Sequence, residues 1–256
     1  MTDIRALLDA GLEDHHAGRL EEAEARYRAA LADEPENAEV HHLLGIVAFQ
    51  SGRVTDACAL FEGAVAHAPE TAKYLGNLGA ARIAAGRAAD AVDVLQQSVA
   101  LEPDVSEVLK NLGVSLGESG RLDDAVDALR RAVEAEPNNA SAGANLAVTL
   151  LRLDRHDEAL AAAEAAAAAD PEDGEGPNAL GVVLTALGRH EEAVNAFRDA
   201  VRCVPEHLEP GRNLALALES AGRPDEALVQ IRAVRERWPN DTSIAAIFDR
   251  LEVAGG

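Results

Sequence analysis

A proline recurs at a fixed interval along almost the whole chain, and this period constrains the fold more than any other feature. Seven prolines follow one another at intervals of 34 residues: Pro35, Pro69, Pro103, Pro137, Pro171, Pro205 and Pro239. A constant period in the range of about 20–50 residues is typical of repeat architectures, in which each repeat is one supersecondary unit stacked on the next. The 256 residues are therefore expected to form an array of similar units.

Three further positions keep the same register. Each unit contains a glycine, replaced by aspartate in the fifth unit, at Gly18, Gly52, Gly86, Gly120, Asp154, Gly188 and Gly222. An arginine follows each of these residues, and an alanine lies four residues after each arginine. The apolar residues on both sides have helical spacing, which predicts a helix, a tight turn with left-handed backbone at the glycine, and a second helix that stops at the proline.

These residues carry a family resemblance. A 34-residue helix-turn-helix with Leu-Gly in its first helix, then alanine, an aromatic residue and a closing proline resembles the tetratricopeptide repeat. Two units show the pattern in full, through Leu44, Gly45, Ala57, Phe61 and Pro69, and through Leu180, Gly181, Ala193, Phe197 and Pro205. The resemblance implies an all-α, right-handed α-solenoid.

The fifth unit departs from this pattern. It has Asp154 at the turn and Ala163 in place of the second-helix aromatic residue, so we expect it to be the least tightly packed. In the other units, small residues such as Gly45, Gly79 and Gly181 are expected to let the two helices approach closely. Larger side chains at these positions would push the helices apart.

The register divides the chain into one repeat domain over 1–256. The expected repeats are 4–37, 38–71, 72–105, 106–139, 140–173, 174–207 and 208–241. A helix over 242–254 is expected to cap the array, because Ile244, Ile247, Phe248 and Leu251 form a single apolar stripe. The partition leads us to expect that the chain is complete.

The net charge of the chain argues against nucleic-acid binding. The chain has 23 Lys and Arg against 45 Asp and Glu, a formal charge of −22, whereas nucleic-acid binding needs clustered basic residues. The N-terminus lacks the features of a signal peptide, and no apolar stretch is long enough to insert into a membrane. With Cys58 and Cys203 as its only cysteines, the chain is expected to be cytoplasmic and to form no disulfide.

The resemblance places the first helix of each repeat on an inner, concave surface. By register, that surface carries seven acidic and five basic side chains: Asp9, Glu39, Glu107, Glu118, Glu175, Glu209 and Glu219, with Arg5, Lys73, Lys110, Arg152 and Arg212. We therefore expect a nearly neutral groove. Many remaining acids lie in the first turn of the second helices, where a carboxylate offsets the helix dipole.

An asparagine series is the clearest functional signal on this surface. Asn77, Asn111, Asn145 and Asn213 occupy one inward position, and Ala179 interrupts the series. Asparagine is a mediocre helix former, and its amide offers both a donor and an acceptor for a peptide backbone. The series resembles the asparagine ladder in the repeat region of O-GlcNAc transferase. A structural role, in which these side chains bond only neighbouring helices or water, remains the alternative.

Other candidate sites are weaker. Lys73 and Lys110 project inward beside the series and favour general contact with a peptide over a dedicated carboxylate clamp. The pairs His15-His16 and His41-His42 lie out of register, so no metal site is predicted. The chain carries no catalytic motif, and we expect no cofactor and no catalytic residue.

The sequence thus predicts a non-enzymatic module for protein–protein interaction, which binds an extended peptide or a partner helix in its groove. Two alternatives remain. One is a scaffold that self-associates as a homo-oligomer, since the first repeat has apolar residues and no preceding cap. The other is a substrate-recruiting partner of a separate glycosyltransferase or sulfotransferase, because similar arrays precede such domains in bacteria.

Overall fold

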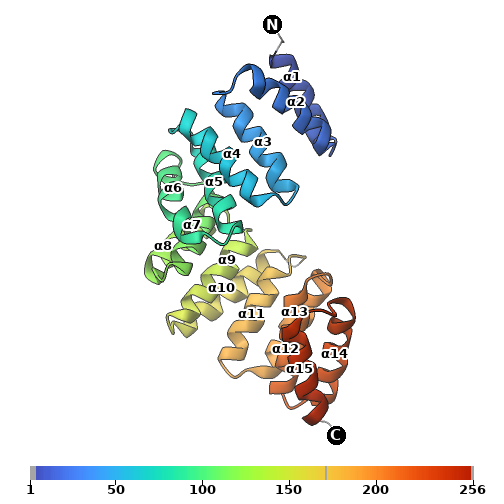
Figure 1. Cartoon of the computed structure of the whole chain (residues 1–256). Helices are drawn as coiled ribbons and strands as arrows, with labels where there is room; N and C mark the ends of the chain where they lie inside the picture. The colour runs from blue at the N-terminus through green and yellow to red at the C-terminus, as the bar shows by residue number, and fades with distance from the viewer. Residues whose placement is uncertain (1–3, 171, 255–256) are drawn as a thin grey trace. The chain divides into compact units, whose positions relative to one another are not determined.

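The computed structural model describes residues 4–170 and 172–254, and this part of the chain is built from helices and connecting turns (Figure 1). It divides into two compact units, 1–121 and 122–256. The first unit contains α1 Ile4–His16, α2 Leu20–Asp33, α3 Ala38–Gln50, α4 Val54–His67, α5 Ala72–Ala84, α6 Ala88–Leu101 and α7 Ser106–Glu118. The second contains α8 Leu122–Ala135, α9 Ala140–Arg152, α10 His156–Ala169, α11 Glu175–Ala186, α12 His190–Cys203, α13 Leu208–Ser220, α14 Pro224–Arg237 and α15 Thr242–Ala254.

The predicted turns are confirmed by the backbone. The six turn glycines have φ between 71° and 79°, and Asp154 has φ of 57°. Each turn closes with an N–H that reaches back five residues, as when the N–H of Arg53 donates to the carbonyl of Ala48 at 2.9 Å. This is the pattern of a left-handed helix C-terminus, where glycine carries no steric cost.

The prolines end helices as predicted. α2, α4, α6, α8, α12 and α14 each end two residues before a proline, and the residue before it has left the helical conformation, as at Glu34 with φ −129° and ψ 79°. A proline ring disfavours helical backbone in the residue that precedes it. Pro171, the seventh member of the series, lies outside the described residues.

Close approach of the paired helices depends on glycine in the first helix. A Cβ atom placed on Gly45 would lie 2.6 Å from ring carbons of Phe61, and one on Gly181 would lie 2.6 Å from ring carbons of Phe197. Both phenylalanines are buried, with 3% and 2% of their surfaces exposed. The predicted close approach of the two helices is thus confirmed at these glycines, each of which packs against the aromatic residue of its own repeat.

The expectation for the fifth repeat is wrong. α9 and α10 pack closely, and Ala159 and Ala163 are fully buried. A Cβ atom on Gly143 would lie 2.9 Å from that of Ala166, so the two helices approach closely where this glycine faces an alanine. Small residues on both helices thus allow this close approach.

The turn arginines pair with acids in the first turn of the following helix, a pairing that the sequence pattern did not predict. Arg155 lies 2.8 Å from Glu158, Arg189 lies 2.6 Å from Glu192, and Arg223 lies 2.7 Å from Glu226. Hydrogen bonds from these arginines lower the pKa values of the three glutamates. Each of these glutamates therefore interacts favourably with the positive end of the helix dipole and also forms an ion pair with the arginine of the preceding turn.

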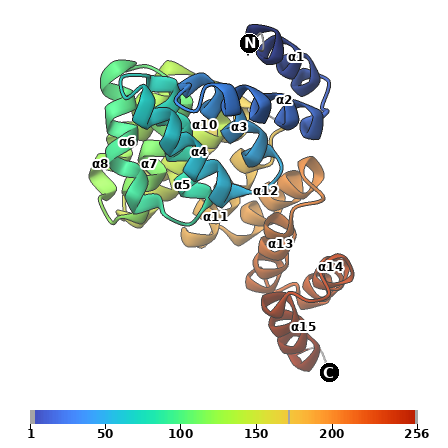
Figure 2. The same ribbon diagram turned by 45° about the horizontal axis from the view of Figure 1, so that its top comes forward.

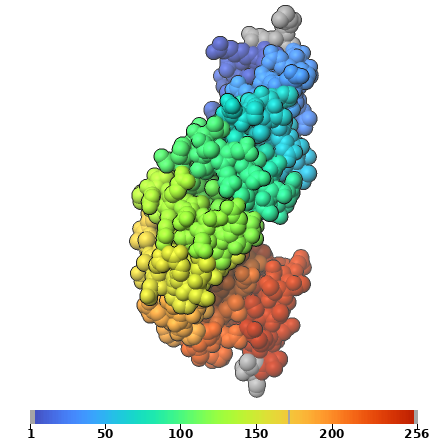
Figure 3. Space-filling view, turned by 90° about the vertical axis from the view of Figure 1, so that its left-hand side faces the viewer, coloured from blue at the N-terminus to red at the C-terminus, as the bar shows by residue number. Residues whose placement is uncertain are grey.

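The apolar stripe of α15 is buried. Ile244, Ile247, Phe248 and Leu251 join a core cluster with residues of α12, α13 and α14, and α15 packs against α14 (Figure 2). Arg235 lies 4.0 Å from the centroid of the Phe248 ring. Within each unit, side chains fill the spaces between consecutive helices, as the space-filling view shows for the yellow and orange helices of the second unit (Figure 3).

Candidate functional site

The first helices of successive repeats share one surface in each unit. In the first unit these are α1, α3, α5 and α7, and in the second unit α9, α11 and α13. We call this surface the first-helix face of the unit. α5 packs against α7, and α11 packs against both α9 and α13. The asparagine series is distributed over both faces, with Asn77 and Asn111 in the first unit and Asn145 and Asn213 in the second, and all four side chains are half-buried.

In the first unit, Asn77 is bonded to the neighbouring first helix. Its Nδ2 lies 2.7 Å from Nε2 of His42, on α3. His42 is only 2% exposed, and its ring lies against those of Tyr74 and Phe61, with centroid distances of 4.6 and 5.7 Å. Burial lowers the pKa of His42 from 6.5 to about 4, and the charge of Lys73 acts in the same direction. The imidazole is therefore neutral at pH 7 and can accept the amide proton.

In the second unit, the two asparagines are bonded differently. Asn213 donates from Nδ2 to Oδ1 of Asn178 at 3.1 Å, which joins α13 to α11. Asn145 donates to the carbonyl of Ser141 within its own helix, at 2.8 Å. The series is thus partly structural, since Asn77 and Asn213 link neighbouring helices.

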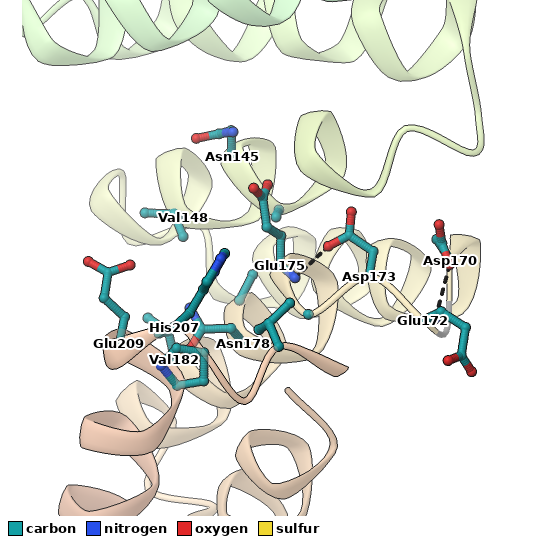
Figure 4. Close-up of a pocket in the computed structure, with 15 residues that line it drawn as sticks. Asn145, Val148, Asp170, Glu172, Asp173, Glu175, Asn178, Val182, His207 and Glu209 are labelled. Atoms are coloured by element: carbon teal, nitrogen blue, oxygen red, sulfur yellow. Dashed lines mark hydrogen bonds between the residues drawn. The ribbon is translucent and has the colours of Figure 1, made fainter. Parts of the chain in front are cut away.

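A cavity of about 620 Å³ opens on the first-helix face of the second unit (Figure 4). Asn145 and Val148 of α9 form one wall, and Asn178, Ala179 and Val182 of α11 form another. The loop before α11 contributes Asp170, Glu172, Asp173 and Gly174, and the loop before α13 contributes Val204 and His207. The lining is completed by four further residues of the helices: Ala144, Glu175, Glu209 and Pro210. The volume is in the usual range for a ligand site.

The lining of this cavity is strongly acidic, so the expectation of a nearly neutral groove is wrong for this part of the surface. Five carboxylates line the cavity, and its described lining residues include no lysine or arginine. By register, only Glu175 and Glu209 were expected on this surface. Asp170, Glu172 and Asp173 have no place in the helical register because they lie in the loop between α10 and α11.

Two of these carboxylates also organise the loop. Oδ1 of Asp170 accepts from the N–H of Glu172 at 3.0 Å, and Oδ1 of Asp173 accepts from the N–H of Glu175 at 2.6 Å (Figure 4). The second bond serves an N–H at the start of α11 that has no partner within the helix. The sequence signal for this site was the loop itself, since residues 170–175 contain four acids.

A smaller hollow of about 220 Å³ lies on the first-helix face of the first unit. It is lined by Ile46, Phe49, Gln50, Phe61, Asn77 and Ala80. Phe49 is 38% exposed, so an aromatic surface lies beside the amide of Asn77. The two units therefore each place one member of the asparagine series in a hollow, one apolar and one acidic.

The two lysines differ in their surroundings. Lys110 of α7 lies 2.8 Å from Glu107 in the same helix, whereas Lys73 of α5 is exposed. Asn111, beside Lys110, has no side-chain hydrogen bond within the described residues. Both lysines thus lie on the helices that carry Asn77 and Asn111, although Lys110 is partly neutralised.

The two histidine pairs differ in their contacts, and the rings of His15 and His16 are stacked with their centroids 6.5 Å apart. Nε2 of His15 lies 2.8 Å from Oε1 of Gln50, and the ring centroids of His41 and His67 are 5.4 Å apart. Within residues 4–170 and 172–254, no three His, Cys, Asp or Glu side chains are arranged to hold a metal ion. In the same ranges, none of the helices has the length and apolarity to traverse a bilayer.

The helical pairs, their Gly-Arg turns and the stacked first helices define a tetratricopeptide-type repeat protein. The sequence model described as the Cilia and flagella-associated protein 70 C-terminal domain matches residues 15–246. The chain belongs to this tetratricopeptide repeat family, and the predicted all-α repeat fold is confirmed. Such repeats are generally non-catalytic modules for protein interaction.

Solved structures share the fold. A tetratricopeptide repeat protein from Parabacteroides merdae superposes with a TM-score of 0.80 at 14% identity, over 97% of this chain and 98% of that one. MamA is 28% identical with a TM-score of 0.58, over 65% of this chain and 96% of that one. YrrB, described as a protein with an unusual peptide-binding site, gives a TM-score of 0.55 at 20% identity, over 72% and 95% of the two chains. No curated protein matches the chain.

Proposed function

We propose that this protein is a non-enzymatic interaction module that binds an extended peptide segment of a partner protein on its first-helix faces. The observation that carries the proposal is the position of Asn145 in the wall of the 620 Å³ cavity of the second unit. There, an amide that can both donate and accept lies beside apolar side chains. Pockets that combine a few polar groups with apolar walls are typical of binding sites.

The asparagine amides retain bonding capacity for a peptide backbone. An Asn side chain has two N–H donors and an oxygen acceptor. Asn145 uses one donor for Ser141, and Asn213 uses one for Asn178. Each keeps its oxygen and a second N–H for a ligand, so the structural bonds orient the amides and still permit pairing with a peptide.

The family supports this function. Tetratricopeptide repeats are interaction modules, and the fold is shared with YrrB, whose structure is described as containing an unusual peptide-binding site. In the first unit, the hollow beside Asn77 offers Phe49 and Ile46 to an apolar side chain. A peptide bound there would bury apolar surface while its backbone met the amide of Asn77.

Peptide selection from a random linear library with the full chain, followed by calorimetry of the selected peptides, tests this proposal. Replacing Asn77, Asn111, Asn145 and Asn213 with Ala is expected to weaken binding at least tenfold. A matched variant with Ala at the exposed Asn138, Asn195 and Asn240 should bind like the unmodified chain.

The single variant Asn145→Ala separates binding from stability, because it loses only a bond within its own helix. A selected peptide whose affinity is unchanged in both the fourfold and the single variant contradicts the proposed role of the asparagines. A library from which no peptide is enriched contradicts peptide binding altogether.

Self-association is the second candidate function. Ile4, Leu7, Leu8 and Leu12 of α1 pack against a core cluster formed by buried residues of α2 and α3 but remain partly accessible. Contact between two such surfaces would bury apolar area. Light scattering over a wide concentration range tests it: a mass that rises with concentration supports self-association, and a constant monomer mass of 26.8 kDa contradicts it.

A further inference from the structure

We infer that the cavity of the second unit selects a cationic side chain, lysine or arginine, from the extended peptide. This inference rests on the proposed function, and it assigns a positive charge to the one peptide side chain that enters the cavity. The side chain would enter the cavity of about 620 Å³ that is lined by α9, α11, α13 and the loops before α11 and α13.

The carboxylates of the cavity lack the cations that neutralise acids elsewhere in the same unit. Glu158, Glu192 and Glu226 are each paired with at least one arginine. By contrast, Glu172, Glu175 and Glu209 form no ion pair within the described residues. With Asp170 and Asp173 they give the cavity five carboxylates, whose negative potential a bound cation would offset.

The arrangement of these groups suits a side chain on a peptide. In the view of Figure 4, Glu175 lies between Asn145 and Asp173, Asp170 and Glu172 lie at the right, and Glu209 lies at the left beside His207. The carboxylates are thus spread along the cavity, and the described residues contain no cluster arranged to hold a metal ion. A long flexible cation reaches such dispersed acceptors.

The apolar part of the lining fits the same occupant. Val148, Val182, Ala179 and Pro210 line the same cavity as the five carboxylates. Lysine and arginine bury their aliphatic stems against apolar surface while the charged end meets polar groups. The amides of Asn145 and Asn178 lie in the same walls and are available to the peptide backbone.

Phage-displayed libraries of nine-residue linear peptides provide the test, with the full chain as bait. One library has arginine fixed at the centre, a second has glutamine there and a third has glutamate, with all other positions random. We expect enrichment from the arginine library. The tightest peptide is then synthesised with arginine and with citrulline, its neutral isostere, and binding is measured by fluorescence anisotropy.

The double variant Glu175→Gln/Glu209→Gln should weaken binding of the arginine peptide about tenfold and leave the citrulline peptide within about twofold. The matched variant Glu134→Gln/Glu236→Gln removes the same charge from exposed helix positions outside the cavity and should have no such effect. Raising the ionic strength should weaken binding of the arginine peptide only.

The outcomes separate the two proposals. Equal affinity for the arginine and citrulline peptides, or enrichment from the glutamine library alone with loss of binding in Asn145→Ala, overturns the inference and leaves peptide binding intact. Absence of enrichment from all three libraries overturns the proposed function and the inference together.

Discussion

Asn77 and His42 are joined by a hydrogen bond of 2.7 Å that links α5 to α3 on the first-helix face of the first unit. The amide nitrogen donates, so Nε2 of His42 accepts and the ring proton of the neutral imidazole resides on Nδ1. Protonation of His42 would replace the acceptor with a second donor and place a charge in a site that is 2% exposed. The bond therefore depends on the neutral form of the ring.

Because of His42, the free energy of unfolding is predicted to decrease as the pH is lowered. Its pKa is about 4 in the folded protein and 6.5 in the unfolded chain, so only the unfolded state binds the proton between these values. This contribution is fully present above pH 6.5 and is lost by pH 4, a decrease of about 3 kcal/mol in the free energy of unfolding. Urea unfolding at pH 7, 5.5 and 4 measures it.

The control for this prediction is His42→Gln, which keeps an acceptor for Asn77 and cannot titrate. Carboxylates with lowered pKa values, such as Asp14 and Glu24, also reduce stability in acid, and they do so in both proteins. The variant should therefore show a shallower pH dependence. Parallel curves for the two proteins would refute the assigned role of His42.

Asp154 is predicted to be a mildly destabilising turn residue. It is exposed and has φ of 57°, a conformation that costs free energy for any residue with a side chain. Asp154→Gly relieves this strain but gains entropy in the unfolded chain, so the net stabilisation should be about 0.5 kcal/mol. Gly188→Ala, at φ of 73°, should destabilise by about 1 kcal/mol. Chemical denaturation measures both, and a destabilised Asp154→Gly protein would count against the turn argument.

Gly181 and Phe197 are predicted to be energetically coupled. A methyl group on Gly181 would lie 2.6 Å from the ring of Phe197, so Gly181→Ala should cost about 1–3 kcal/mol. Phe197→Leu removes part of that ring, and the double variant should be more stable than the sum of the two single effects implies. A double-mutant cycle by chemical denaturation tests this, and strictly additive costs would show that the two residues do not constrain each other.

The repeat register predicted the helices and turns because each recurring residue has one local physical role. The turn glycines allow left-handed backbone, and the prolines stop the second helix, so their spacing places these elements without knowledge of tertiary contacts. The fifth repeat shows the limit. Ala163 suggested loose packing, but the outcome depended on Gly143 and Ala166, whose proximity is visible only in three dimensions.

The candidate site was predicted less completely for the same reason. Register placed Asn145 on the correct helix, but the cavity also depends on Asp170 and Asp173, which lie in a loop that has no inward position in a helical register. The partners of Asn77 and Asn213 are His42 and Asn178, which lie 35 residues earlier, one position off the repeat period. Comparison of equivalent positions, which lie 34 residues apart, therefore cannot reveal these pairs.

The most direct test of the account is the side-chain amide NMR signal of Asn145 during titration with a selected peptide. The chain is labelled with ¹⁵N, and the Asn145 and Asn195 resonances are assigned from the variants Asn145→Ala and Asn195→Ala. Binding across the first-helix face should shift the Asn145 amide and leave that of the exposed Asn195 on α12 unchanged. Saturation of the chain with peptide while the Asn145 resonances stay in place would contradict the central claim.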